Sequence, residues 1–271
     1  MSGRRSAGIA SATVILVALA AAGCGGARGS TIGGVGERTL VVFAAASLRE
    51  PVEAAGAGYE ARHRGLVVRV AYASSTALRV QIEEGAPADL FLSADLANAD
   101  RLEAAGLTAG SPVPFAGNRL AIVVPAGREL VRAPRDLAAD GVAVIAAGEG
   151  VPITAYAGQL VGRLATLPGY PGDFAARYAA NVVSREDDVA AVVAKIGLGE
   201  GDAAIVYATD VARTPGVETI PLPAGVEIVA TYAGVVVRDS PGAAEGRAFL
   251  EWLAGPDGRA AFGAAGFASP P

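Results

Sequence analysis

Cysteine and histidine are almost absent from this chain of 271 residues, with one of each, Cys24 and His63. A single cysteine excludes an intrachain disulfide and any metal site built from several cysteines. A Ser-His catalytic pair would depend on His63 alone, and the sequence has no Gly-x-Ser-x-Gly elbow. No cluster of histidine, cysteine and carboxylate residues indicates a bound metal ion. We therefore expect a protein that is not an enzyme and needs no cofactor.

Basic residues are also scarce, with 22 Lys and Arg against 27 Asp and Glu and a formal net charge of −5. A nucleic-acid-binding surface requires a positive patch or stripe. The acidic, lysine-poor composition therefore predicts no nucleic-acid partner.

A long apolar run occurs only at residues 9–22, and it is too short to span a bilayer comfortably. Two arginines precede this run, and Ala21-Ala22-Gly23-Cys24 closes it with small residues. This pattern predicts a secretory signal over residues 1–23. Its end resembles the bacterial lipobox, which implies that Cys24 becomes the lipid-bearing first residue; a chance cysteine is the alternative. Residues 24–37 are rich in Gly, Ser and Thr and predict a flexible tether. We expect an exported protein, anchored by lipid to the outer face of the cell membrane or periplasmic.

From Thr39 onward, short apolar runs alternate with helical patterns, which predicts an α/β fold whose mixed, mostly parallel sheets are flanked by helices on both faces. In such sheets, ligands bind at the carboxyl ends of strands. The expected strands are 40–44, 66–71, 90–93, 120–124, 142–146, 203–207 and 226–237. The expected helices are 48–63, 76–84, 94–105, 153–164, 173–179, 187–197 and 241–254.

Two of these strand ends carry serines where a helix begins. In the first turn, Ser47 and Glu50 have the spacing of a capping box. The second turn contains Ser74 and Ser75. Free N–H groups, helix dipoles and hydroxyl donors at neighbouring strand ends would form a site for an anion.

Two apolar segments, residues 117–125 and 226–237, suggest that the chain passes from one lobe to another and back. This division predicts a discontinuous first lobe (38–117 plus 235–271) and a second lobe (118–234), joined by two hinge crossovers.

At this point several motifs, taken together and in order, resemble one family over residues 38–267. That family is the molybdate-binding proteins of ABC import systems, which have the two-lobe, type II periplasmic binding protein fold. The motifs are Val42-Phe43-Ala44-Ala45-Ala46-Ser47-Leu48, Ala73-Ser74-Ser75, residues 81–95, Asn118-Arg119-Leu120, Val151-Pro152, Glu186-Asp187-Asp188-Val189, Ile205-Val206-Tyr207-Ala208-Thr209-Asp210 and residues 262–267.

The resemblance implies a set of ligand contacts. Ser47 and Ser75 would bind through hydroxyl and backbone N–H groups, Ile153 and Val189 through backbone N–H groups, and Tyr207 through its hydroxyl. The family has Ala-Gly where this chain has Ile153-Thr154, which affects the local backbone geometry. The resemblance also implies a monomer that binds molybdate or tungstate between its lobes and delivers the ion to a membrane permease.

This set consists of neutral donors, and the nearest basic residue is Arg49, which we expect to point outward from its helix. A donor-only site favours a fully ionised oxyanion over hydrogen phosphate, whose O–H would be left unpaired. That argument requires Asp187 and Asp188 to face solvent at a helix start. Two alternatives remain, namely another tetrahedral oxyanion such as sulfate, or ferric iron with Tyr207 as a phenolate ligand. A signalling or adhesion lipoprotein with an empty cleft is a further class.

Overall fold

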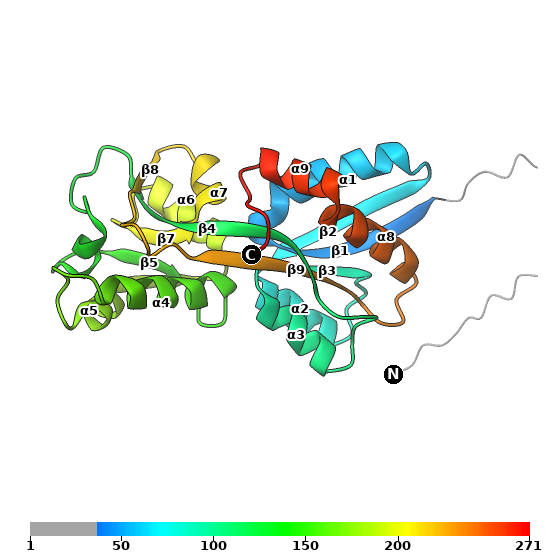
Figure 1. Ribbon diagram of the computed structural model, residues 1–271, viewed down its shortest axis with the longest axis horizontal. Coiled ribbons are helices and arrows are strands. Elements are labelled where there is room, and N and C mark those ends of the chain that lie inside the picture. The colour runs from blue at the N-terminus through cyan, green and yellow to red at the C-terminus, as the bar shows by residue number, and fades with distance from the viewer. Residues whose placement is uncertain (1–36) are drawn as a thin grey trace, which may run out of the picture. The chain divides into compact units, whose positions relative to one another are not determined.

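The computed structural model describes residues 37–271 as an α/β protein of two lobes (Figure 1). The expected signal segment, Cys24 and all but the last residue of the expected tether lie outside the described residues. Within residues 37–271, no helix has both the length and the apolar character required to cross a membrane.

The strands are β1 (Arg38–Ala45), β2 (Leu66–Ala73), β3 (Leu90–Ser93), β4 (Val113–Pro125), β5 (Val144–Ala147), β6 (Val182–Glu186), β7 (Ala204–Tyr207), β8 (Val217–Ile220) and β9 (Val229–Val236). The helices are α1 (Arg49–Arg62), α2 (Ser75–Glu83), α3 (Leu96–Ala104), α4 (Pro152–Ala165), α5 (Phe174–Ala180), α6 (Val189–Gly197), α7 (Ala208–Ala212), α8 (Ala243–Ala254) and α9 (Pro256–Ala264), with short 3₁₀ helices η1 (Ala46–Leu48) and η2 (Pro134–Ala138).

The first lobe is built on the strand order β2-β1-β3-β9-β4. Strand β1 pairs in parallel with β2 and β3, whereas β9 runs antiparallel to β3 and β4. Helices α1, α8 and α9 lie on one face of this sheet and α2 and α3 on the other (Figure 1). Both faces of the sheet are therefore covered by helices. The carboxyl end of β1 points toward the second lobe (Figure 1).

The alternation of side chains along β1 explains how this edge is held. Leu40 and Val42 are fully buried in the larger core, whereas Phe43, the residue after Val42, packs in a second cluster with Leu78 and Phe91. Successive strand residues point to opposite faces, so each face of β1 is fixed by its own apolar layer. The turn that follows β1 is thereby held in place from both sides.

In the second lobe, β4 pairs antiparallel with β7 and β8, and β5 pairs in parallel with β6. A parallel bridge between Val144 and Ala203 links β5 to the segment that enters β7. Among the named strand pairs of residues 37–271, three are parallel and four are antiparallel. The sheet is mixed, as expected, and its antiparallel share is larger than the sequence indicated because β4 and β9 run in opposite directions between the lobes.

The two crossover strands lie side by side. Strand β4 changes partner from β9 to β7 between Arg119 and Leu120, and β9 begins with Val229 opposite Arg119. Just before this point, the backbone of Gly117 exchanges hydrogen bonds of 2.7 and 2.8 Å with Ala268 near the C-terminus. A Cβ atom at Gly117 would lie 2.5 Å from the carbonyl oxygen of Ser269, so only glycine fits there.

Candidate oxyanion-binding site

One small cavity, of about 10 Å³, brings together residues from both lobes. The free space is on the scale of a water molecule, so the lining residues of the two lobes lie close together. All five residues expected to bind the ligand line it. The complete lining is Ala45, Ala46, Ser47, Ser74, Ser75, Ala94, Val151, Pro152, Ile153, Asp188, Val189 and Tyr207.

Ser47 lies in the 3₁₀ turn that follows β1 and is 2% exposed. Its Oγ is 2.9 Å from the hydroxyl of Tyr232 on β9. The expected capping box with Glu50 is wrong, because Leu48 is the residue before α1 and no side chain caps that helix. Ser47 already belongs to a helical turn, and its hydroxyl is held at the cavity by a partner from a distant strand.

Ser75 is the first residue of α2 and is 1% exposed. Its Oγ accepts a hydrogen bond of 3.0 Å from the backbone N–H of Ala94. The preceding Ser74 has the structural role expected of it, because its side chain caps α2 by accepting from the N–H of Ala77. Since Ser75 Oγ accepts a hydrogen bond from the Ala94 N–H, its own O–H remains free to donate.

Helix α4 presents Ile153, its second residue, at the cavity. N–H groups in the first turn of a helix have no intrahelical acceptor, so this N–H is available to a ligand. The neighbouring Thr154, which replaces the family's glycine, has its hydroxyl 2.9 and 3.1 Å from the carbonyl oxygens of Gly148 and Ala147. The side chain thus bonds to the backbone at the end of β5, and the departure from the family motif leaves the start of α4 helical.

Helix α6 presents the N–H of Val189, its first residue, from the same lobe. Asp188 precedes it and caps the helix by accepting from the N–H of Ala191 at 2.9 Å. Asp187 is exposed. Of the two aspartates expected to face solvent, Asp187 does so, whereas Asp188 lines the cavity and directs one carboxylate oxygen to its own helix.

Tyr207, the last residue of β7, is 1% exposed. Within the described part of the chain, its hydroxyl is buried without a hydrogen-bond partner. Burial raises the pKa of this hydroxyl well above its usual range, so the group keeps its proton. An orphaned buried hydroxyl is costly in the empty protein. The residue lines the small cavity.

A basic residue also lies behind the cavity, contrary to the expectation that only Arg49 comes near. The guanidinium of Arg213 is 3.3 Å from the carbonyl oxygen of Ser47, 3.2 Å from Glu50 and 3.1 Å from Asp210. Arg49 itself points outward, stacked 4.3 Å over the ring of Tyr72. The spacing of Asp210 and Arg213 after a strand-terminal tyrosine is the one sequence signal that could have indicated this cation.

The lobes also meet directly beside the cavity. The hydroxyl of Thr76, in the first turn of α2, donates a hydrogen bond to the carbonyl oxygen of Gly150 before α4. Together with the contact of Arg213 to Ser47, this bond connects the two lobes at the rim of the site.

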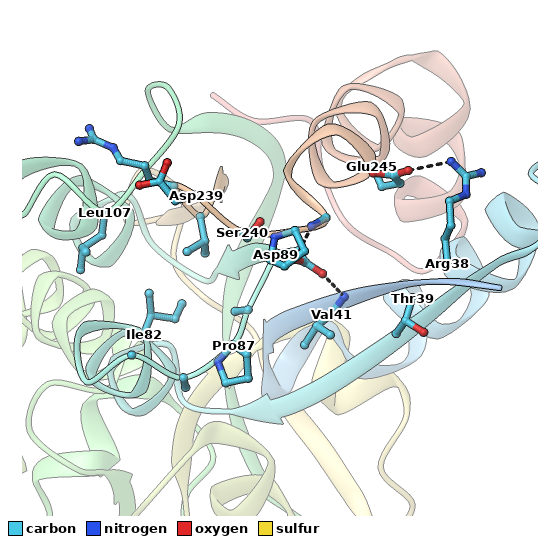
Figure 2. Close-up of a pocket in the computed structure, with 17 residues that line it drawn as sticks. Arg38, Thr39, Val41, Ile82, Pro87, Asp89, Leu107, Asp239, Ser240 and Glu245 are labelled. Atoms are coloured by element: carbon cyan, nitrogen blue, oxygen red, sulfur yellow. Dashed lines mark hydrogen bonds and ion pairs between the residues drawn. The ribbon is translucent and has the colours of Figure 1, made fainter. Parts of the chain in front are cut away.

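A larger cavity, of about 640 Å³, lies toward the start of β1 (Figure 2). The buried carboxylate of Asp89 accepts hydrogen bonds from the N–H groups of Val41 at 2.7 Å and Gly242 at 2.9 Å. Asp239 and Glu245 also line this cavity. Arg38, which pairs with Glu245 at 2.7 Å, and Arg238 line it as well. None of the five residues expected to bind the ligand lines this cavity, whereas all five line the small cavity between the lobes.

Comparisons with known proteins identify the family and the fold. The sequence family described as bacterial extracellular solute-binding protein matches residues 40–268. The molybdate-binding protein ModA of Mycobacterium tuberculosis H37Rv is 33% identical over 268 residues, which cover 98% of each chain. The periplasmic molybdate-binding protein of Azotobacter vinelandii has a similar structure, with a TM-score of 0.72, 24% identity, and coverage of 86% of this chain and 100% of that one. The sulfate-binding protein SubI of M. tuberculosis H37Rv gives a TM-score of 0.74 at 22% identity, over 85% and 86% of the two chains. The two structural likenesses show a shared fold, and the sequence matches establish that this chain belongs to the family of bacterial extracellular solute-binding proteins.

Proposed function

We propose that this protein is the substrate-binding component of an ABC importer that captures molybdate or tungstate between its lobes and delivers the ion to a membrane permease. The observation that carries the proposal is the buried, unpartnered hydroxyl of Tyr207, which faces the same small cavity as Ser47 and Ser75. The similarity to molybdate-binding proteins along nearly the whole chain supports it.

The donor set is strong enough for the task. About seven hydrogen bonds to charged oxygens, at ~1.5–3 kcal/mol each, supply roughly 10–21 kcal/mol before costs. A micromolar complex requires only about 8 kcal/mol. The difference is available for removing water from the anion and for closing the lobes.

The protonation of the hydroxyl groups supports an oxyanion without protons. Ser75 receives a hydrogen bond from Ala94, and Tyr207 has no partner within residues 37–271, so both direct a proton into the cavity. Hydrogen phosphate would bring a further proton to a site whose expected ligand groups are donors. Asp188 also lines the cavity, so the argument requires its carboxylate to stay with the start of α6, where it accepts from the Ala191 N–H. Molybdate, tungstate and sulfate bring acceptors alone, so the size of the pocket formed around the bound ion must separate molybdate and tungstate from sulfate.

Ferric iron is the weaker alternative. It would require Tyr207 as a phenolate, whereas burial raises the pKa of that hydroxyl. Among the described residues, no group of three or more His, Cys, Asp or Glu side chains is arranged to hold a metal ion.

Closure would occur about the two crossover strands. We infer lobes that follow the expected division, with the return crossing near Val229, where β9 begins, and so earlier than position 234. A hinge of this kind lets the cleft open by rotation of one lobe relative to the other.

We further infer that Cys24 carries a lipid and that residues 24–37 tether a monomer to the outer face of the membrane. The sequence Ala21-Ala22-Gly23-Cys24 supports this inference. Cys24→Ser should release the protein from the membrane fraction into the soluble fraction. A Cys24→Ser protein that remained in the membrane fraction would show that the anchor lies elsewhere.

The proposed function can be tested by calorimetry with molybdate, tungstate, sulfate and phosphate in parallel titrations. Molybdate and tungstate should bind at micromolar concentrations or better, sulfate more weakly, and phosphate not measurably. Ser47→Ala should weaken molybdate binding by about 1–3 kcal/mol. Ser240→Ala is a matched control, because Ser240 lines the cavity of Figure 2 and its substitution should leave affinity unchanged. Equal affinity for sulfate, or no binding of molybdate, would overturn the proposal.

A further inference from the structure

Behind Ser47 lies a hydrogen-bonded row of buried polar side chains that the ligand would not touch. Tyr232 and Asn118 are fully buried, and Thr209 is 2% exposed. They come from β9, β4 and α7, so the network forms where both crossover strands meet the second lobe. Each hydroxyl in such a network can donate only one hydrogen bond. Once one donor is fixed, the donor and acceptor at every later contact are therefore fixed as well.

Asn118 determines which group donates at each contact of this network. Its side-chain nitrogen lies 2.8 Å from the hydroxyl oxygen of Thr209 and 3.4 Å from that of Tyr232. With the amide in this orientation, its nitrogen donates and Tyr232 accepts at this contact, so the Tyr232 proton is free for another partner. Two hydroxyls lie near it: Ser47 Oγ is within hydrogen-bond distance, at 2.9 Å, whereas the Tyr207 hydroxyl forms no hydrogen bond within residues 37–271.

The consequence falls on Ser47. Because Tyr232 donates to its Oγ, the Ser47 hydroxyl directs its own proton into the cavity. Ser75 reaches the same state by accepting from the Ala94 N–H. Donation in the reverse direction would turn the Ser47 proton toward Tyr232 and leave an acceptor facing the ligand.

We propose that Asn118 and Tyr232 are positioning residues that keep Ser47 a hydrogen-bond donor, and that they thereby make the site select oxyanions without an O–H of their own. This inference rests on the proposed function and adds the groups that determine its specificity. The ligand class is a fully deprotonated tetrahedral dianion, and the class rejected is a hydrogen-bearing one such as hydrogen phosphate.

The first test is a double-mutant cycle in molybdate affinity. Tyr232→Phe keeps the ring that packs against Phe115 and Phe267, and it should weaken binding by about three- to tenfold. In a Ser47→Ala background the same substitution should have no further effect, because its partner is gone. An equal loss in both backgrounds would mean that Tyr232 supports the fold alone, and would overturn the proposal.

The second test is the ratio of molybdate to phosphate affinity, measured near pH 8, where phosphate is mainly the hydrogen-bearing dianion. Tyr232→Phe leaves the Ser47 hydroxyl free to accept, so this ratio should fall by about tenfold or more. Asn118→Asp should lower it as well, because a carboxylate accepts the Tyr232 proton and reverses the direction of donation. The added charge acts on two dianions alike and cancels in the ratio. An unchanged ratio in both variants would contradict the proposal.

Tyr59→Phe is the matched control, because Tyr59 is 4% exposed and packs with Phe249 and Trp252 in the first lobe. Its affinity and its ratio should equal those of the unaltered protein. Failure of the unaltered protein to bind molybdate would refute the proposed function. Molybdate binding with unaltered selectivity in the variants would refute only the proton-directing role.

Discussion

Among the substitutions at the site, Tyr207→Phe has effects on the ligand-free protein and on the molybdate complex that differ in sign. The change removes one oxygen atom and keeps the ring, which is 1% exposed and lies 5.6 Å from the ring of Tyr232. In the empty protein that oxygen has no hydrogen-bond partner among residues 37–271. The same atom is therefore a cost without ligand and a gain with it.

The two effects have opposite signs and comparable size. Loss of a hydrogen bond to a charged acceptor should weaken molybdate binding by ~1.5–3 kcal/mol, or about 10- to 150-fold in Kd. Removal of an unsatisfied buried hydroxyl should raise the free energy of unfolding of the ligand-free protein by about 1 kcal/mol. In a protein of this size that gain corresponds to roughly 2–4 °C in Tm.

Titration calorimetry measures the first effect, and a thermal melt without and with saturating molybdate measures the second. The variant should melt higher than the unaltered protein without ligand and gain less from added ligand. Tyr170→Phe is the matched control, because the Tyr170 ring packs against Phe174 in the second lobe, with ring centroids 5.0 Å apart. Unaltered molybdate affinity, or a lower Tm without ligand, would refute the reasoning.

Three further substitutions test a residue that lines the cavity, a hydrogen bond between the lobes and a buried carboxyl group near Arg213. Ser75→Ala should weaken molybdate binding by about tenfold and lower the free energy of unfolding by about 1 kcal/mol, because the Ala94 N–H loses its acceptor; calorimetry and chemical denaturation measure the two effects. Thr76→Val should raise Kd severalfold, mainly through faster dissociation in stopped-flow traces, because it removes the bond to Gly150 that joins the lobes. Asp210→Asn should flatten the dependence of stability on pH, because burial raises the pKa of Asp210 to about 7.

The sign of the Asp210 effect follows from its two pKa values. In the unfolded chain the carboxyl has a pKa near ~4, so the folded protein holds its proton more tightly. Its stabilising contribution is present in full below pH ~4 and is lost as the pH rises through about 7, with a slope of up to about 1.4 kcal/mol per pH unit. Exposed Asp100 is the control, because Asp100→Asn should retain the slope of the unaltered protein. A Ser75→Ala or Thr76→Val protein with unaltered affinity and dissociation would show that the affected bond does not contribute to ligand retention.

Local sequence patterns were sufficient to predict which residues line the cavity, but not which distant residues hydrogen-bond to them. Ser47, Ser75 and Tyr207 stand where strands end, and the alternation of apolar runs and helical patterns predicts those ends correctly. The partner of Ser47 could not be predicted, because Tyr232 lies on a strand far along the chain and no local pattern links them. For the same reason Ser47 was expected to cap its own helix, which is the commonest local use of such a serine.

The elements missed by the sequence analysis are short or lack a regular pattern. Strand β6 alternates exposed and partly buried residues, strand β8 has four residues, and α7 has five. Helix α9 is rich in alanine and glycine and offers few apolar residues by which its face could be recognised. Its position depends on packing against α8 and α1, which is information that only the folded chain contains.

The pairing of Gly117 with Ala268 also constrains the order in which the molecule can assemble. These residues are separated by about 150 positions, and contacts between such distant segments form late because a long loop must close first. Strand β4 must likewise wait for β9, which emerges after nearly the whole second lobe. The second lobe can therefore gather its core early, whereas the first lobe, which needs β9, α8 and α9, and the hinge are completed only when the last residues of the chain arrive. Loss of those few residues should leave two folded lobes that cannot close on each other correctly.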